Sequence, residues 1–407
     1  MPPRRNSPAA KPPGRSTRNR RVGGADRADH AAVMIGNGGD AGRDRAITAA
    51  LTRWFAASAR DLPWRATPRN PYHALVAEAM LQQTQVSRVI DFFHRFLARF
   101  PTVAALAAAS EAEVLALWSG LGYYRRAKNL HAAAKTVVAD YAGRIPDTAE
   151  ALATLPGIGP YTAGAIASIV FDQPAPLVDG NVLRVLQRLE ARDDFENDRI
   201  KATWAWQRAG ELVQASISVG GPAAFNEGLM ELGATVCLAP PAQPQCLLCP
   251  LRDHCRAHAE GLTDRIPSPR ERATQKAAHC LVLVIRDKCS RILVEQRPHT
   301  GMWAGMWQCP TLDLDRAPTP ADAADFARLK SADPASLKPL GDFTHNTTHR
   351  RLHFVAIAAD AVPCKRQSST RVWLDANNAD AIAKLGISNA QRRVLMIGCP
   401  DPRRVGR

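Results

Sequence analysis

The sequence has no long hydrophobic run and comparatively few acidic residues. Its longest apolar stretches, such as "CLVLVI" at residues 280–285, are far below the roughly 18 residues needed to cross a bilayer, which excludes a transmembrane protein. Only 38 aspartates and glutamates stand against 53 lysines and arginines, so the formal net charge is +15. This basic excess favours a polyanionic partner, and nucleic acid is the first expectation.

The first 45 residues lack any helical or strand periodicity. They are rich in proline, glycine, arginine and alanine, so they cannot bury enough surface to offset the entropy of ordering. We predict a disordered basic tail over residues 1–45. No secretory signal is present, but the acid-poor composition also fits an organelle transit peptide, and Met34 offers a second start. We expect a cytoplasmic protein in a bacterial source and a nuclear or organellar one in a eukaryote.

The rest of the chain divides into a helical and a strand-rich part. Apolar residues recur with helical spacing over residues 46–261, as in "NVLRVLQRLE", which predicts an all-α domain. Residues 262–278 turn to proline and charge and are predicted to form a linker. Strand-like runs such as "LHFVAIAA" follow, so we predict an α+β domain over 279–398 and a short tail over 399–407. With 46% hydrophobic residues, each domain can build its own core.

Four of the nine cysteines are clustered. Cys237, Cys246, Cys249 and Cys255 lie within nineteen residues, and the others are scattered singly. Because no secretory signal is present, four thiolates on one metal ion or cluster are favoured over disulfides. Spacing alone is compatible with zinc and with an iron–sulfur cluster.

The stretch "LPGIGPYTAGAIASIV" at residues 155–170 has the form of the hairpin in a helix-hairpin-helix motif. Gly157 and Gly159 permit a tight turn and leave backbone N–H groups free to bind phosphate, and a larger side chain would keep a DNA backbone away. A glycine-proline turn between two helices that binds nothing is the plainer alternative.

Two carboxylates have the surroundings of an acid and base pair. Asp179 stands at the start of an amphipathic helix, where an N-cap role is the simpler explanation. Glu78 shares a mostly apolar helix face with Leu75, Leu81 and Gln82. An acid among apolar neighbours either has a partner, as in a buried salt bridge, or keeps its proton to higher pH, as a general acid does.

These residues together resemble the adenine DNA glycosylases of the MutY type, within the helix-hairpin-helix glycosylase superfamily. The resemblance covers about residues 47–261 through "DLPWR", "EAMLQQTQV", "WSGLGYYRRAKNLH", "LPGIGPYTAGAI", "VDGNV", "FNEGLMELGATVC" and the four cysteines. The C-terminal third looks like the Nudix-related domain with which this family reads the base opposite adenine, most clearly in "GMWAGMWQCP".

The resemblance implies an enzyme that removes adenine by two-carboxylate chemistry. Glu78 matches the family's acid and Asp179 its stabiliser of the sugar cation, with Tyr161 and Asn181 beside them. The remaining matches belong to the adenine pocket and its support (Trp64, Arg65 and Glu227) and to the groups that enter the base stack and hold the opposite base (Gln83, Thr84, Leu121 and Tyr123). Adenine must be flipped out of the duplex for this reaction.

Tyr161 distinguishes this chain from the related endonuclease III-like enzymes. They carry a lysine at the corresponding place, where the amine forms a Schiff base with the sugar and the strand is cut. A phenol cannot form an imine. The resemblance therefore implies base excision without strand cleavage, and makes a bifunctional glycosylase and lyase the less favoured alternative.

The resemblance also implies a cofactor and a partner. The four cysteines match the family's loop for one [4Fe-4S] cluster, although the first gap holds eight residues where six is usual. The implied role is structural, because hydrolysis of a glycosidic bond needs no electron. The implied partner is double-stranded DNA containing adenine opposite 8-oxoguanine or guanine, bound by a protein that is expected to be monomeric and to need no membrane.

The C-terminal part lacks the residues of an active Nudix hydrolase. Such an enzyme holds magnesium with several glutamates of one helix, and this chain has no glutamate after Glu295. A lesion-reading module is therefore favoured. In "DFTHNTTHRRLHF" the family's opposite-base triplet is matched to Thr347, Thr348 and His349, or alternatively to Phe343, Thr344 and His345. A third hypothesis, a DNA-binding protein without activity, is disfavoured by the two carboxylates.

Overall fold

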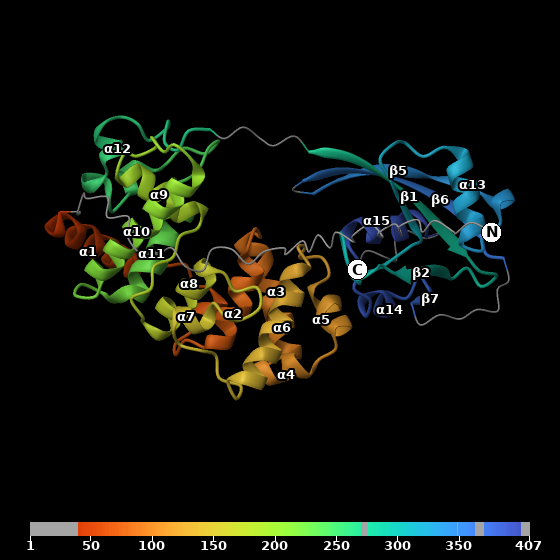
Figure 1. Cartoon of the computed structure of the whole chain (residues 1–407), viewed down its shortest axis with the longest axis horizontal. Coiled ribbons are helices and arrows are strands. Elements are labelled where there is room, and N and C mark those ends of the chain that lie inside the picture. The colour runs from red at the N-terminus through yellow and green to blue at the C-terminus, as the bar shows by residue number, and fades with distance from the viewer. Residues whose placement is uncertain (1–39, 270–274, 348, 363–369, 400–407) are drawn as a thin grey trace, which may run out of the picture. The chain divides into compact units, whose positions relative to one another are not determined.

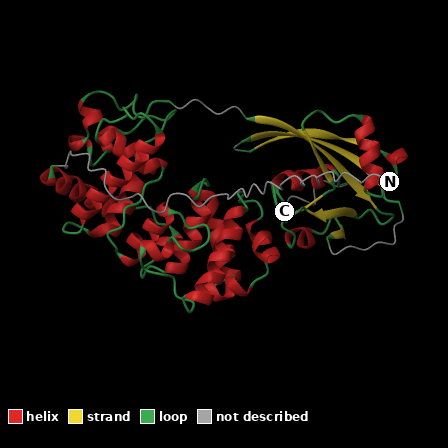
Figure 2. Ribbon diagram, viewed as in Figure 1, coloured by secondary structure: helices red, strands yellow, loops and turns green. Residues whose placement is uncertain are grey.

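The structure, a computed structural model, describes residues 40–269, 275–347, 349–362 and 370–399. In these residues the chain is helical from Ala41 to Ala259 and forms its strands only from Lys276 onward (Figures 1 and 2). We refer to residues 41–259 as the helical part and to residues 276–399 as the sheet part. The predicted fold class, all-α followed by α+β, is confirmed.

Most helices of the helical part begin at a residue whose side chain accepts a backbone hydrogen bond, as Asn70, Ser110 and Asn197 do. The helices are α1 (Ala41–Ser58), α2 (Pro71–Leu81), α3 (Val86–Arg99), α4 (Val103–Ala108), α5 (Glu111–Trp118), α6 (Arg125–Asp140), α7 (Ala149–Leu152), α8 (Pro160–Phe171), α9 (Gly180–Leu189), α10 (Asp198–Ser216), α11 (Gly221–Thr235) and α12 (Arg256–Ala259). Short 3-10 turns lie at Pro63–Arg65, Cys246–Leu248 and Arg252–His254.

The helical part has two hydrophobic cores that share one helix. The first core gathers apolar side chains from α2 to α6, and the second gathers them from α1, α9, α10 and α11. Helix α8 contributes Ile166 and Ala167 to the first core and Ala165 to the second. Segments of the chain on either side of α8 are thereby brought together at the junction of the two cores.

The sheet part is a seven-stranded mixed sheet with the order β3-β2-β1-β6-β5, in which β4 also pairs with β1 and β7 with β2. Its strands are β1 (Lys276–Arg286), β2 (Ile292–Gln296), β3 (Trp307–Gln308), β4 (Thr311–Leu314), β5 (Lys338–Asn346), β6 (Arg350–Asp360) and β7 (Arg371–Leu374). Strands β1 and β6 run parallel and pair without interruption from Lys276 and Arg350 to Arg286 and Asp360.

Helices cover both faces of this sheet. On β1, Val282 and Val284 face a core that includes side chains of α14 (Ala379–Ala383) and α15 (Asn389–Ile397). The alternate residues Leu281 and Leu283 face a second core against α13 (Pro320–Leu329). The run "CLVLVI" is continuously apolar because both of its faces are buried.

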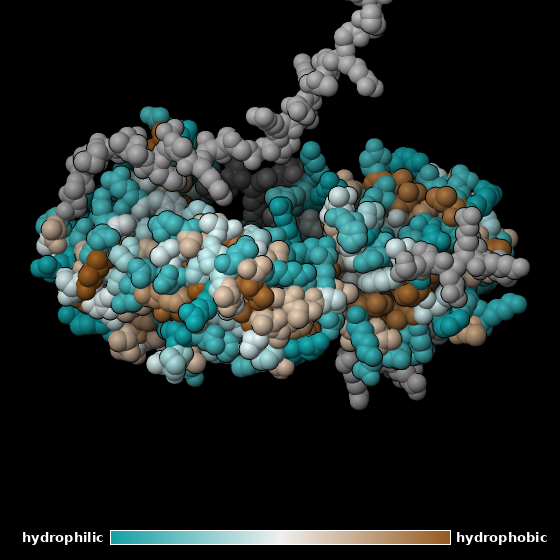
Figure 3. Space-filling model, turned by 60° about the horizontal axis from the view of Figure 1, so that its bottom comes forward, coloured by the Kyte–Doolittle hydropathy of each residue, from teal (hydrophilic) through white to brown (hydrophobic). Residues whose placement is uncertain are grey.

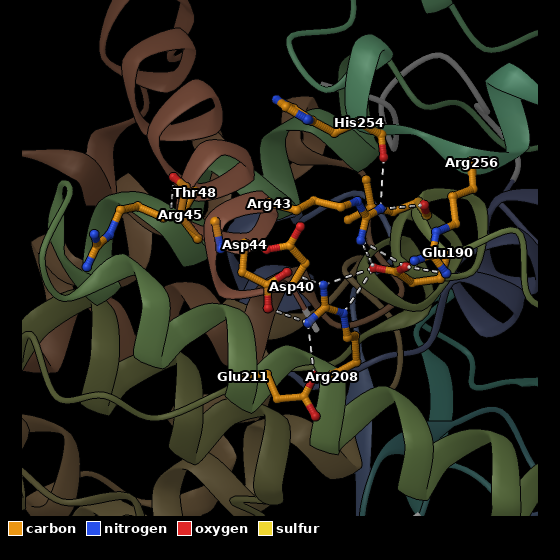
Figure 4. A network of polar contacts seen from close by, with 12 residues as sticks. Asp40, Arg43, Asp44, Arg45, Thr48, Glu190, Arg208, Glu211, His254 and Arg256 are labelled. Atoms are coloured by element: carbon orange, nitrogen blue, oxygen red, sulfur yellow. Dashed lines mark hydrogen bonds and ion pairs between the residues drawn. The ribbon is translucent and has the colours of Figure 1, made fainter. Parts of the chain in front are cut away.

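The first helix begins earlier than the sequence pattern indicates. Helix α1 starts at Ala41, within the predicted tail of residues 1–45, of which residues 1–39 lie outside the described part. Arg43 donates to Glu190 and to the carbonyl of His254, and Asp44 forms a buried ion pair with Arg208 (Figure 4). These long-range contacts stabilise the first turn of α1, whose sequence has no apolar stripe that would predict a helix.

Two other predicted boundaries differ in the same way. Strand β1 begins at Lys276, inside the predicted linker of residues 262–278, because its first residues pair with β6 rather than pack in a core. Cys399, assigned to the C-terminal tail, is buried against the sheet. Both differences arise from tertiary pairing that local composition does not record.

The described residues include no helix that is long and apolar enough to span a membrane. Hydrophilic residues cover most of the face seen in Figure 3, with smaller hydrophobic patches between them.

Candidate active site

Glu78 lies on α2, and its carboxyl group has the environment of an acid. Burial, opposed by a hydrogen bond from Tyr161 and reinforced by the negative charges of Asp179 and Glu227, raises its pKa to about 7. Those four side chains, from α2, α8, α11 and the start of α9, therefore lie close together at the junction of the two cores. In the described part of the chain Glu78 has no ion pair, so the salt-bridge alternative is not supported.

Asp179 is the N-cap of α9 and also lies in the group of side chains around Glu78. Its Oδ1 accepts a hydrogen bond from the backbone N–H of Val182 at 2.7 Å, and its Oδ2 accepts one from Asn181 Nδ2 at 3.2 Å. These two hydrogen bonds fix the orientation of the carboxylate at the start of the helix. The capping role considered from the sequence is real, and it orients the carboxylate next to Glu78 rather than competing with a role there.

Asn181 is held from its other side. Its Oδ1 accepts a hydrogen bond from Arg184 Nη2 at 3.0 Å, and the same guanidinium donates to the carbonyls of Gly233 and Cys237. Helices α9 and α11 approach so closely here that a Cβ on Gly233 would lie 2.8 Å from the Cβ of Asn181. The amide that supports Asp179 is thus fixed by packing and by hydrogen bonds.

Tyr161, on the first turn of α8, keeps its phenolic proton. Burial and the nearby negative charges of Glu78 and Asp179 raise its pKa well above its usual range. Its hydroxyl also lies 3.2 Å from the Sδ of Met230. The group therefore offers a neutral hydrogen-bonding phenol, and the groups that act on the pKa of Glu78 include no amine.

Arg65 and Glu227 belong to a buried ion-pair network. Arg65 contacts Glu227 and Glu231 at 3.0 Å each, Arg69 contacts Glu227 at 2.6 Å, and Arg60 contacts Glu231 at 2.6 Å. Burial raises the pKa of Glu227 even though Arg69 and Arg65 oppose it, whereas for Glu231 the arginines outweigh burial and the pKa is lowered. Arg65 is therefore no solvated surface charge, because its side chain is 12% exposed.

Sequence reasoning missed three members of this network, Arg60, Arg69 and Glu231. A signal was available, because Glu227 and Glu231 lie four residues apart on the otherwise apolar α11 and so share one face. Trp64, assigned with Arg65 to the adenine pocket, packs edge-on against Phe93 at a ring distance of 5.4 Å and lies against the first core.

Two loops carry the residues assigned to the base stack. We call them the 82–85 loop, between α2 and α3, and the 119–124 loop, between α5 and α6. Gln83 and Tyr123 are exposed, Thr84 is half-buried and Leu121 is buried. Gln83, Thr84 and Leu121 line a common open hollow, together with Arg88 and Gly120. The structure thus brings the residues of both loops together, although Leu121 is less accessible than a side chain that enters a base stack.

The helix-hairpin-helix segment comprises α7, the turn and α8, and the two glycines of its turn, Gly157 and Gly159, differ. Gly157 has a φ of +76°, and a Cβ there would come within 2.4 Å of Asn129. Gly159 caps α8 with an ordinary φ of −91°, and a Cβ there would meet nothing within 4 Å. Of these two glycines, the fold itself requires only Gly157.

The four clustered cysteines converge, as their spacing predicts. Cys237, Cys246, Cys249 and Cys255 all line one small cavity at the end of α11. Arg188 Nη1 lies 3.3 Å from the Sγ of Cys237 and also donates to the carbonyl of Leu238. The described residues contain no set of three histidine, cysteine or acidic side chains placed to hold a single metal ion.

The two candidate triplets of the sheet part have different settings. Thr347 and His349 lie in the turn between β5 and β6, and Thr347 exchanges hydrogen bonds with Arg350 across it. Thr348 lies outside the described residues. The alternative triplet lies within β5, where Phe343 is buried against the core and the Thr344 hydroxyl is 3.2 Å from Nδ1 of His353.

Comparisons with known proteins identify both parts. Residues 76–207 match the family described as HhH-GPD superfamily base excision DNA repair protein, and residues 281–396 match the NUDIX domain. A solved thermostable thymine-DNA glycosylase is similar with a TM-score of 0.48 and 27% sequence identity, and the match covers 54% of this chain and 98% of that one.

Curated relatives with the name adenine DNA glycosylase include a plant and a mammalian protein. The protein of Arabidopsis thaliana is 33% identical, and the match covers 86% of this chain and 63% of that protein. The protein of Mus musculus is 34% identical, and the match covers 85% of this chain and 76% of that protein. This chain belongs to the adenine DNA glycosylases, a family of base excision repair enzymes that here combines a helix-hairpin-helix part with a Nudix-like part.

Proposed function

We propose that this protein hydrolyses the N-glycosidic bond of adenine paired with 8-oxoguanine or guanine in duplex DNA and leaves an abasic site without cutting the strand. The observation that carries the proposal is the meeting of Glu78 and Asp179. One carboxyl group has a pKa of about 7 through burial, and the other accepts two hydrogen bonds at the start of α9. Glycosidic bond cleavage needs this combination of a proton donor and an anion.

The reaction follows from these two groups. Protonated Glu78 gives its proton to the ring system of the departing adenine, and the electron pair of the breaking carbon–nitrogen bond leaves with the base. Asp179 stabilises the positive charge that develops on the sugar. Water then adds to the sugar carbon and gives a proton to the Glu78 carboxylate, which restores the acid. The Asn181 and Val182 hydrogen bonds keep Asp179 in place during these steps.

Tyr161 supports the monofunctional character of the proposal. A lyase needs an amine that attacks the sugar, and the side chains that act on Glu78 are a phenol and two carboxylates. The phenol is buried and protonated, so it offers a hydrogen bond to the acid and no nucleophile.

The four cysteines fit one [4Fe-4S] cluster, which we include in the proposal. Four cysteines line one cavity, and the Arg188 guanidinium beside Cys237 would offset thiolate charge. When bound, the cluster supplies cross-links that order a basic loop, because the hydrolysis needs no electron transfer. Arg43 reinforces this loop by donating a 2.8 Å hydrogen bond to the carbonyl of His254 (Figure 4).

The cofactor is tested by colour and metal content. We expect purified protein to absorb at about 400 nm through thiolate-to-iron charge transfer and to contain iron. Cys249→Ser should lose this absorbance, whereas the scattered Cys289→Ser, an exposed residue of the sheet part, should keep it. Colourless and active protein with one bound zinc would contradict the iron assignment.

The activity is tested with a duplex that carries adenine opposite 8-oxoguanine. We expect an alkali-labile site to form at the adenine position, and strand cleavage only after alkali is added. Cleavage without alkali would contradict the monofunctional assignment, and no abasic site on this or the adenine–guanine duplex would contradict the proposed function.

A further inference from the structure

Arg126, near the start of α6, ties together the 82–85 loop and the 119–124 loop. Its Nη1 donates to the carbonyls of Ala79 at 3.1 Å, Met80 at 2.7 Å and Gln82. Its Nη2 donates to the Thr84 hydroxyl and to the Gly122 carbonyl, both at 3.1 Å. One guanidinium thus binds the end of α2 and both loops.

Burying this arginine costs folding free energy that its contacts do not fully offset. It is 8% exposed, no carboxylate pairs with it in the described part of the chain, and its buried Nε has no hydrogen-bond partner. Burial lowers its pKa to about 10, which leaves it charged at neutral pH. An apolar side chain of similar length would leave the folded protein more stable. Stability alone therefore does not account for an arginine here, whereas the geometry that its guanidinium imposes on the two loops does.

The bonds of Arg126 fall at the two most constrained points of the loops. Gln83 has a φ of 56° and Tyr123 a φ of 50°, a left-handed conformation that residues other than glycine rarely adopt. The carbonyls of Gln82 and Gly122 belong to the peptide groups directly before these two residues, and Arg126 binds both. It also lies 5.3 Å from the Tyr123 ring centre. The guanidinium therefore fixes the direction in which the side chains of Gln83 and Tyr123 project from the protein surface.

We propose that Arg126 is a positioning residue for base extrusion, which locks the 82–85 and 119–124 loops in the conformation that separates adenine from its opposite base. This inference rests on the proposed function. Arg126 itself is covered by the two loops, so it acts through Gln83, Thr84 and Tyr123 and not by contact with the reacting atoms.

The test compares two substrates under single-turnover conditions. One is a duplex with adenine opposite 8-oxoguanine, and the other carries the adenine unpaired in a bubble, where extrusion is already largely complete. We expect Arg126→Met to slow excision from the duplex by roughly 10 to 100 fold, since extrusion costs a few kcal/mol, and from the bubble by less than about threefold. Arg126→Lys, which keeps the charge but has one donor atom, should lie between Arg126→Met and the wild type.

The matched control is Arg208→Lys, another buried arginine, which pairs with Asp44 and Glu190 and not with these loops. It should leave the ratio of the two rates unchanged. Equal losses on duplex and bubble for both Arg126 variants would show that Arg126 only supports the fold, and would overturn the inference. If Arg126→Met does not fold, the ratio for Arg126→Lys decides in the same way.

A second readout separates this inference from the proposed activity. With 2-aminopurine in place of adenine, extrusion is followed as the fast rise in fluorescence on binding, before any base is excised. We expect the rise with the wild type and with Arg208→Lys, and a much smaller rise with Arg126→Met. If the wild type excises nothing but extrudes 2-aminopurine in an Arg126-dependent manner, the proposed function fails and the positioning role stands. An equal rise in all three proteins would overturn the positioning role.

Discussion

At the scale of single residues, two carboxyl groups of similar chemistry are made different by their surroundings. Glu78 is enclosed, faces other negative charges and receives only one hydrogen bond that favours its ionised form. Asp179 accepts two hydrogen bonds at the start of a helix. The difference is a property of folding, because α2 and α9 are about a hundred residues apart in the chain and meet only across α8.

The first prediction replaces the acid. Glu78→Gln should lower the excision rate by roughly two to four orders of magnitude, since it removes the transferable proton and keeps the shape of the side chain. Duplex affinity should change little. Gel-shift titration and single-turnover kinetics measure the two quantities separately, and near-normal turnover would mean that another group is the acid.

The same substitution should stabilise the protein in a pH-dependent way. Because the pKa of Glu78 is higher in the folded than in the unfolded protein, ionisation of Glu78 lowers the free energy of unfolding. This free energy is highest below the unfolded pKa near 4.5 and falls as pH rises through about 7. Above pH 7 the wild type must bury a charge that glutamine does not carry. The melting temperature of Glu78→Gln should therefore exceed that of the wild type at pH 8 and approach it at pH 5.

The second prediction concerns Glu227, whose negative charge raises the pKa of Glu78. Glu227→Gln removes that charge and leaves Arg65 and Arg69 less neutralised, so the pKa of Glu78 should fall. The high-pH limb of kcat/KM, which reports loss of the Glu78 proton, should then move to lower pH. Exposed Glu260→Gln serves as the control. An unchanged limb in Glu227→Gln would show that the titrating group is not Glu78.

At the scale of elements, the two glycines of the α7–α8 turn are expected to have different roles, Gly157 in folding and Gly159 in DNA binding. Gly157→Ala should lower the melting temperature, because the added Cβ meets Asn129 and the backbone is left-handed. Gly159→Ala should fold normally but bind duplex more weakly, since only a molecule outside the chain comes near that Cβ. Thermal melts with binding titrations test the pair, and full duplex affinity in folded Gly159→Ala would contradict a phosphate contact there.

Some elements could be predicted from sequence because their signals are local. The stripe in "NVLRVLQRLE" predicts α9, and the spacing of the four cysteines predicts their convergence. Other features depend on distant partners. The first turn of α1 is held by Glu190 and Arg208. Nothing in "YYRRAK" distinguishes Arg126 from the exposed Arg125 beside it, because all but one of the acceptors of Arg126 lie 42 to 47 residues earlier in the chain.

At the scale of the whole molecule, chemistry and lesion recognition are assigned to different parts of the chain. The proposed reactive groups, Glu78 and Asp179, lie in the helical part, and the turn that contains Thr347 and His349 lies in the sheet part. A reader of 8-oxoguanine must offer both a donor and an acceptor, which a threonine hydroxyl can do. The turn favours the triplet 347–349, because in the alternative triplet Phe343 is buried in the core.

The last prediction tests this division. Replacing Thr348 and His349 by alanine should cost about 1 to 3 kcal/mol of preference for 8-oxoguanine over guanine and change excision opposite guanine much less. The paired variant, Thr344→Ala with His345→Ala, should keep the preference. Loss in the second pair alone would shift the triplet by four residues, and loss in neither would leave discrimination to the 82–85 and 119–124 loops.

Helix α8 gives the helical part a further property through its place in both cores. A helix with one face in each core must lose its packing on both sides before it can open. The two cores of the helical part are therefore expected to unfold as one cooperative unit. Amide hydrogens of its middle turns should then exchange among the slowest in the chain. A partly unfolded form that keeps only half of the candidate site is therefore expected to be rare, because neither core opens while the other stays packed.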